Sequence, residues 1–194
     1  MAPALDPTAR RDLYLLVARL FREEVDEPLY HRLLATQSDA VPWIEPEIAE
    51  LPDRLAVEAL ATEYCRLFVG PQPVCPPFAS VVRGEPLLGG RARTAIDEFL
   101  AARGLAVDAH ARIASPDHVA VMLAVLAELS DPDAVQSYLR GFVLPWVPNW
   151  LSTLECAAER VLFHTLARLA RDLIEEDQAS CPVIDTVPSA EVRP

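Results

Sequence analysis

Asp117 and His118 are the neighbouring residues whose types most suggest acid–base chemistry. A carboxylate beside an imidazole could serve as a general acid–base pair. Residues i and i+1 of a helix do not face one another, however, and no serine or cysteine lies in a nucleophile motif such as G-x-S-x-G. A hydrolase that uses this pair is therefore only an alternative. The structural interpretation is that Asp117 complements a helix dipole from the first helical turn and that His118 makes a local hydrogen bond.

Metal and cofactor motifs give weaker patterns. Glu155, Glu159 and His164 invite a di-iron interpretation, but that motif needs Glu-x-x-His on each of two helices. Gly89-Gly90 lacks the following lysine and the spacing of a phosphate-binding loop. The four cysteines are too far apart for a C-x-x-C pair: Cys65, Cys75, Cys156 and Cys181. We expect free thiols in a reducing cytoplasm, with no metal site and no cofactor.

A proline-rich segment is the remaining candidate. Residues 70–80 contain four prolines and must form an extended loop, which displays Phe78 beside a helix end carrying Leu67 and Phe68. The chain is acidic, with a formal charge of −12. Apolar side chains held by a stiff loop in an acidic protein suit a partner that is both apolar and cationic, such as a signal-type peptide. Core packing explains Leu67 and Phe68 about as well, and prolines in such a loop can simply shape it.

Composition excludes two classes of partner. The 194 residues include 17 arginines, no lysine and 29 acidic residues, so there is no basic stripe for nucleic acid. Apolar stretches are broken well before the roughly 20 residues of a membrane span. Arg10-Arg11 resembles an export signal, but charged residues interrupt the apolar run that should follow. Apolar residues from 13 to 21 recur instead at helical spacing, with Asp6 as N-cap and Pro7 at the first helical position.

The elements that carry these residues read as helices throughout. Helical periodicity follows prolines at six positions: Pro7, Pro28, Pro52, Pro116, Pro132 and Pro148. We predict an all-α single helical-bundle domain of about seven or eight helices, over residues 1–177, that ends in one long helix from about Leu151 to Leu173. The three tryptophans are assigned to packing rather than to ligand stacking. Residues 104–116 could be a hinge between two subdomains, and we expect residues 178–194 to form a mobile tail.

Three segments of the chain together resemble a known family. Residues 63–71 read EYCRLFVGP and residues 76–81 read PPFASV; Gly104-Leu105 is followed by SPDH at 115–118. Residues 138–148 read YLRGFVLPWVP before the last helical stretch. In this order the motifs resemble those of the TorD/DmsD family of molybdoenzyme maturation chaperones. Phe78 stands where tyrosine or tryptophan is more usual in that family, and Val82 stands near a position where an aromatic residue is common. Phe142 stands where the family's C-terminal motif has histidine.

The resemblance implies a cytoplasmic, non-enzymatic function. Such a chaperone binds the twin-arginine signal peptide and the apoprotein of a molybdoenzyme catalytic subunit, assists molybdenum cofactor insertion and delays export. The signal-peptide site that it implies comprises Leu67, Phe68, Pro76, Pro77, Phe78, Ser80, Pro116, Asp117 and His118, with Asp117, Glu63 or Glu85 as partners of the signal arginines. A NarJ-type assembly chaperone for a non-exported molybdoenzyme subunit is the nearest alternative. Either a monomer or a domain-swapped homodimer is compatible with the linker at 104–116.

Overall fold

The regular structure of this chain is helical. A computed structural model describes residues 5–108, 113 and 115–180, and in these ranges it has no strand and a single isolated β-bridge. The helices are α1 (Pro7–Arg22), α2 (Glu27–Thr36), α3 (Pro46–Ala49), α4 (Asp53–Tyr64), α5 (Ala79–Val82), α6 (Gly90–Ala101), α7 (Val119–Glu128), α8 (Pro132–Tyr138), α9 (Val147–Ala157) and α10 (Val161–Ala179). Two π-helical turns, η1 (Cys65–Val69) and η2 (Leu139–Val143), continue α4 and α8. The all-α prediction is confirmed, and the number of helices exceeds the expected seven or eight because short helices such as α3 and α5 carry too few residues to show a period.

The start of α1 follows the predicted chemistry, whereas Pro52 is the N-cap of α4 and Pro116 lies three residues before α7. Asp6 caps α1 by accepting hydrogen bonds from the amides of Thr8 and Ala9, and Pro7 occupies the first helical position. Asp26 and Asp131 cap α2 and α8 in the same way. These side chains satisfy amides that have no partner within the helix, so each start is fixed locally.

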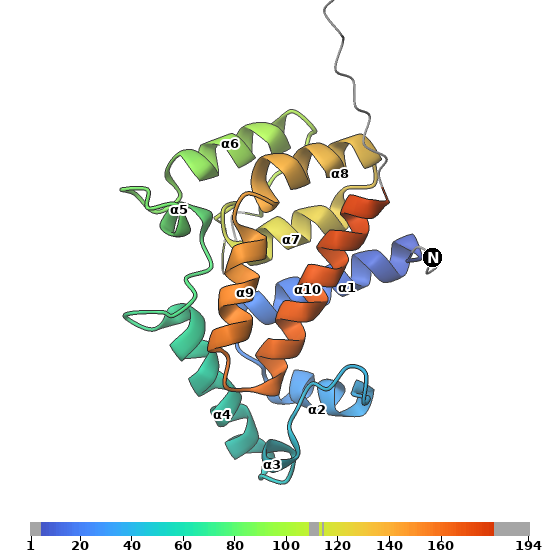
Figure 1. The fold of residues 1–194 in the computed structure, drawn as a ribbon, viewed down its shortest axis with the longest axis vertical. Helices are drawn as coiled ribbons and strands as arrows, with labels where there is room; N and C mark the ends of the chain where they lie inside the picture. Colours follow the sequence, from blue (N-terminus) through green and yellow to red (C-terminus); the bar gives the residue numbers. More distant parts are fainter. Residues whose placement is uncertain (1–4, 109–112, 114, 181–194) are drawn as a thin grey trace, which may run out of the picture.

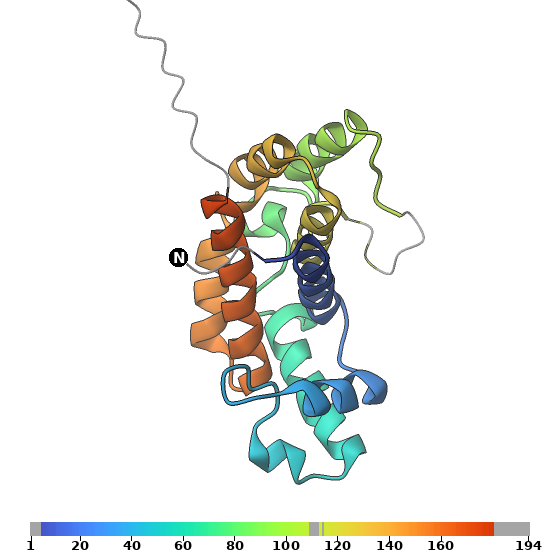
Figure 2. The same cartoon turned by 90° about the vertical axis from the view of Figure 1, so that its right-hand side faces the viewer.

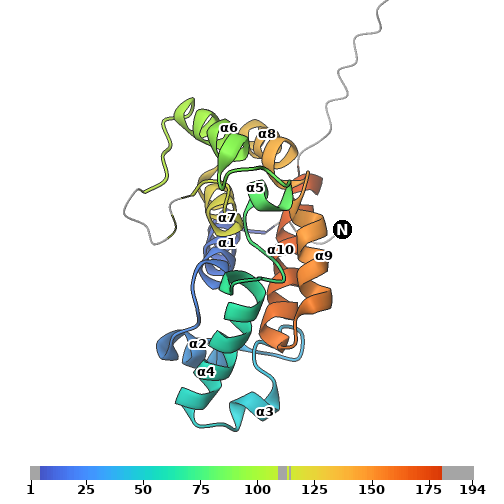
Figure 3. The ribbon, with the colours of Figure 1, turned by 90° about the vertical axis from the view of Figure 1, so that its left-hand side faces the viewer.

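Two helix pairs form the body of the molecule. α1 packs along α7, and α9 packs along α10 (Figure 1). Seen from the side, these pairs form two columns, one blue and yellow and the other orange and red (Figure 2). Helices α2, α3 and α4 lie at one end, and α5, α6 and α8 lie at the other. The chain that connects η1 to α5 runs between the two columns (Figure 3).

Aromatic rings fill the place where the columns meet. The ring of Phe68 in η1 lies 6.0 Å from that of Phe21, 5.1 Å from Tyr64, 6.0 Å from Trp150 and 5.7 Å from Phe163, between centroids. Most of these contacts are edge-to-face, which is the favourable arrangement for aromatic quadrupoles. Phe68 therefore joins α1, α4, α9 and α10 in one core.

The prediction of one long final helix is wrong, because the chain forms two helices there, α9 and α10, with a break between them. The carbonyl of Ala157 accepts a hydrogen bond of 2.7 Å from Arg66, and the amide of Glu159 donates one of 2.7 Å to Glu63. Glu63 and Arg66 also pair with each other at 2.7 Å. This distant ion pair satisfies the backbone groups that the break exposes, so the chain can reverse between two antiparallel helices.

Parts of the predicted domain organisation cannot be compared with the structure. Residues 109–112 and 114, within the expected hinge, and the tail from 181 onward lie outside the described residues. Helix α10 continues to Ala179, so the predicted tail boundary at 178 falls inside that helix.

Among the described residues, no helix combines the length and the apolar character that crossing a membrane requires.

Candidate partner-binding site

The proline loop begins at a tight π-helical end. The amide of Gly70 donates to the carbonyl of Cys65 at 2.7 Å, and a Cβ atom at position 70 would lie 3.1 Å from that oxygen. Glycine avoids this close contact. The loop then folds back on the turn, because the amide of Val74 donates to Arg66 and that of Cys75 to Leu67.

The loop next pairs with the segment that precedes α7. The amide of Val119 donates to the carbonyl of Pro77 at 2.8 Å, and that of Ala79 donates to Asp117 at 2.9 Å. These bonds form an antiparallel bridge between Phe78 and His118, whose rings meet edge-on at 4.8 Å. We call residues 75–80 and 115–119 together the proline junction. It joins two sequence segments nearly 40 positions apart.

Asp117 is the polar centre of the proline junction and is fully buried. Its carboxylate accepts hydrogen bonds from the hydroxyl of Ser80 at 2.6 Å, from the amide of Ser80 at 3.2 Å and from the hydroxyl of Ser115 at 2.5 Å. The Ser80 oxygen in turn accepts from the amide of Gly89. Asp117 precedes α7 by two residues, so the expectation that it lies in the first turn of that helix is wrong. Its negative charge is stabilised by directed donors instead.

His118 is the N-cap of α7 and is only 2% exposed. Its Nδ1 accepts a hydrogen bond of 3.1 Å from the amide of Ala120, which agrees with the predicted local bond. Burial lowers the pKa of the imidazole to about 4, although the charge of Asp117 acts in the opposite direction. One ring nitrogen is therefore engaged with the backbone, and the carboxylate beside it is engaged with serines. The pair does not have the geometry of the hydrolase alternative.

The nine predicted site residues fall into two groups. Leu67 and Phe68 belong to the aromatic core, whereas the other seven lie in or beside the proline junction. Seven of the nine are buried, and only Pro76 and Phe78 are partly exposed. Pro76 is tied to the core as well, because its carbonyl accepts a hydrogen bond of 3.1 Å from the indole of Trp150. Their role in binding a peptide stays a prediction, but few of them are at the surface.

The two other carboxylates predicted to pair with the signal arginines differ in how accessible they are to a partner. Glu63 is buried and engaged with Arg66 and the amide of Glu159. Those donors lower its pKa despite the opposing effect of burial. Glu85 is partly exposed and accepts a hydrogen bond of 2.7 Å from the amide of Arg91. Of the three carboxylates proposed for the signal arginines, Glu85 is therefore the one at the surface.

Exposed apolar side chains flank the proline junction, and of these only Val82 is among the residues that the motifs pointed to. We call this set the apolar rim: Val69, Val74, Val81, Val82, Leu87 and Leu88. The two leucines are 72% and 67% exposed. The segments that carry the rim, 69–74 and 81–88, project from the same side of the molecule (Figures 1 and 3). A pair of leucines between Pro86 and Gly89, in a stretch with no helical period, was the available signal.

The matches to known proteins agree with this architecture. A sequence profile of the family described as nitrate reductase delta subunit matches residues 34–152. The chaperone protein TorD of Shewanella piezotolerans is 31% identical over 197 residues, covering 87% of this chain and 90% of that protein. TorD of Shewanella sp. strain MR-4 is 30% identical and covers 88% and 92%. The chain belongs to the TorD/DmsD family of maturation chaperones, as the motifs indicated.

A solved structure supports the same fold. A protein from Archaeoglobus fulgidus, provisionally described as a redox enzyme maturation protein, superposes with a TM-score of 0.58 at 22% identity. The match covers 86% of this chain and 93% of that one. Together with the chaperone relatives and the geometry of Asp117 and His118, the family identifies the protein as a chaperone and not an enzyme.

Proposed function

We propose that this chaperone acts in the cytoplasm on the catalytic subunit of a molybdoenzyme. It binds the twin-arginine signal peptide and the apoprotein, assists insertion of the molybdenum cofactor, and delays export until the subunit is folded. Membership in a chaperone family supports the general role. The apolar rim supports the recognition of an apolar segment.

The exposure of Leu87 and Leu88 is the observation that carries this proposal. Adjacent leucines that are about two-thirds exposed are costly in water, and an apolar surface of this kind marks an interaction site. Burial of one leucine by a partner contributes roughly 1.5–3 kcal/mol. The apolar region of a signal peptide offers the matching chemistry.

The predicted site residues then act mainly from beneath the rim. Phe78 and Pro76 border the surface and can contact the peptide, whereas the buried members hold the rim segments in place. The clearest case is Ser80, which links Gly89 to Asp117 and so fixes both ends of the segment that carries Leu87 and Leu88. A fixed segment loses less conformational entropy when a partner binds.

Charge supplies the second part of the recognition. The chain carries a net charge of −12, and Glu85 lies on the segment that bears the rim. A carboxylate and a guanidinium form short, charge-assisted hydrogen bonds. Because salt screens charges beyond about 8 Å, only carboxylates near the rim contribute to specificity. We assign Glu85 to one of the two signal arginines.

Calorimetry with a synthetic leader peptide tests the proposal. A peptide with S-R-R-x-F-L and its apolar region should bind with a dissociation constant of about 1 μM or lower, which requires roughly −8 kcal/mol. Substituting Leu87→Ser and Leu88→Ser together should weaken binding by roughly a hundredfold or more, because the contributions of two buried leucines are lost. Leu55→Ser is the matched control, since Leu55 is 48% exposed but lies on α4 at the far end of the molecule.

Two results would contradict parts of this scheme. No saturable binding to any cognate leader would remove the signal-peptide function. Normal binding by the Leu87→Ser, Leu88→Ser protein would leave that function standing and would remove the apolar rim as its site. A peptide with both arginines replaced by lysines should bind more weakly, because lysine cannot form the bidentate pair.

The family description favours one further candidate. The matching profile is named for a nitrate reductase subunit, which agrees with a NarJ-type assembly chaperone for a molybdoenzyme subunit that is not exported. Affinity capture of the client from the native host separates the candidates. A client with a twin-arginine leader supports the first, and a client without one supports the second.

A further inference from the structure

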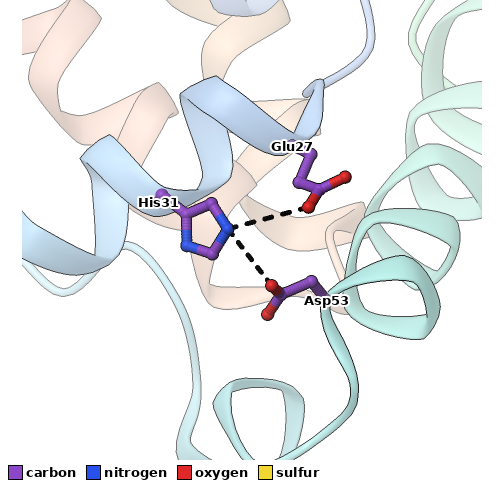
Figure 4. A group of neighbouring side chains, drawn as sticks. All are labelled: Glu27, His31 and Asp53. Atoms are coloured by element: carbon purple, nitrogen blue, oxygen red, sulfur yellow. Dashed lines mark ion pairs between the residues drawn. The ribbon is translucent and has the colours of Figure 1, made fainter.

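A second group of side chains, far from the proline junction, has the chemistry of a metal site. Glu27, His31 and Asp53 converge at the contact between α2 and α4 (Figure 4). The Nε2 atom of His31 lies 3.9 Å from Oε1 of Glu27 and 3.2 Å from Oδ2 of Asp53. The three potential ligand atoms all lie within 4.8 Å of one another.

The sequence explains how these residues meet. Glu27 and His31 are four residues apart on α2 and therefore share a face of that helix. Asp53 is the first residue of α4, immediately after the N-cap Pro52. The packing of α2 against α4 brings it opposite the pair. Sequence motifs for metal sites rely on ligands close together in the chain, so they do not reveal a ligand set spread over two helices.

The distances suit a small divalent cation. Ligands about 2.1 Å from a tetrahedral Zn²⁺ lie roughly 3.4 Å from each other. The distance between His31 and Asp53 already matches this value, and the Glu27 carboxylate needs to move inward by less than about 1.5 Å. All three side chains are exposed, so a change of rotamer can supply that movement.

The electrostatics also favour a cation. Among the ion pairs of the described residues, Glu27 and Asp53 pair with His31 and with no guanidinium. The two carboxylates outnumber the single imidazole, so the cluster carries net negative charge. A divalent cation neutralises this charge, and it replaces repulsion between the carboxylates with two coordinate bonds.

A buried phenol lies next to the cluster. The hydroxyl of Tyr30 is buried without a hydrogen-bond partner in the described part of the chain, and its ring lies 5.6 Å from that of His31. Burial, and to a lesser extent the charge of Asp53, raise the pKa of this tyrosine. Because the Tyr30 ring contacts the His31 ring, a cation bound by His31 should be detectable at Tyr30.

We propose that Glu27, His31 and Asp53 bind a first-row divalent cation such as Zn²⁺, with the remaining coordination position open to water. The ligand set of one imidazole nitrogen and two carboxylate oxygens suits zinc and its neighbours better than calcium or magnesium. The bound ion fastens α2 to α4 and thereby closes the segment between His31 and Asp53. This site is independent of the proposed chaperone function.

Zinc titration of the untagged, reduced and chelator-treated chain tests the proposal. We expect one ion per chain. His31→Ala, Asp53→Asn and Glu27→Gln should each weaken binding by at least about tenfold. Glu58→Gln should bind as the unchanged protein does, because Glu58 is an exposed carboxylate on α4 outside the cluster. Zinc at a hundredfold excess over its dissociation constant should raise the unfolding midpoint by roughly 5–10 °C.

Cobalt provides a spectroscopic control for the cysteines. Co²⁺ bound by nitrogen and oxygen shows d–d bands without the intense thiolate charge-transfer band, and the Tyr30 ring signals in an NMR spectrum should shift. The proposal is overturned if the unchanged chain takes up no zinc saturably, if His31→Ala binds with unchanged affinity, or if cobalt shows the thiolate band. In the first case the cluster is a set of polar contacts between α2 and α4.

Discussion

Replacement of His118 by asparagine should remove a specific pH dependence of stability. Asparagine can accept the amide hydrogen bond of Ala120 as an N-cap, but it does not titrate. His118 is 2% exposed, and burial lowers its pKa from 6.5 to about 4. The unchanged protein should therefore lose stability on acidification that His118→Asn retains.

The sign and size follow from linkage. Between about pH 6.5 and pH 4 the unfolded chain binds a proton at this imidazole and the folded chain does not. The contribution of the neutral imidazole to the free energy of unfolding is therefore fully present above pH 6.5 and is lost as the pH falls through this window. The two pKa values differ by about 2.5, which corresponds to roughly 3 kcal/mol at pH 4 and below.

Urea unfolding of both proteins at several pH values between 7.5 and 4 measures this effect. His118→Asn loses the ring contact with Phe78 and should start with lower stability at pH 7.5. The decisive quantity is the difference between the two proteins, which should shrink by roughly 3 kcal/mol on acidification. Since all carboxylates are common to both, their contributions cancel. Parallel stability curves, or an imidazole that titrates near pH 6.5 in NMR spectra of the folded protein, would refute the argument.

Three further predictions concern the core, an ion pair and the thiols. Phe68→Ala should lower the free energy of unfolding by about 3–5 kcal/mol, measured by urea denaturation, because it empties the centre of the aromatic core; a loss below about 1 kcal/mol would show that the core collapses around the gap. Asp177→Ala should lower the free energy of unfolding by about 3 kcal/mol in the same assay, because Arg10 is largely buried and loses the carboxylate that accepts two hydrogen bonds of 2.6 Å from it. An unchanged unfolding midpoint would contradict this. Cys75 should be alkylated far more slowly than the exposed Cys156 in timed mass spectrometry, since burial raises the pKa of the Cys75 thiol to about 11; equal rates would argue against its burial.

Local patterns predicted what local interactions determine. Asp6 and Pro7 start α1 because a carboxylate and a proline at these positions satisfy the helix end without help from elsewhere. The break before Val161 has no such local cause. It depends on Glu63 and Arg66, which lie more than 90 positions away and supply the donor and acceptor at the break. Helical periodicity in the sequence therefore predicts one continuous helix where the structure has a break.

The sequence allowed us to predict which segments form the candidate site, but not which of their side chains are exposed to solvent. The residues of the loop and of the stretch around Asp117 were selected together, and the structure pairs them through Pro77, Ala79 and Val119. Apolar and polar types alone could not show that Asp117 is turned inward to two serines, because burial depends on the packing of α5 and α7. Leu87 and Leu88 were missed for the opposite reason, since leucines outside a helical period give no sign of which way they face.

The prolines of the junction also limit how the chain can associate with other chains. Pro76 lies two residues before Phe78 and Pro116 lies two residues before its bridge partner His118, so neither position has an amide hydrogen to offer a third strand. The bridge between Phe78 and His118 therefore cannot lengthen into a sheet edge that recruits further chains. A protein that keeps leucines exposed beside an extended segment thus keeps that segment from growing into a cross-β aggregate.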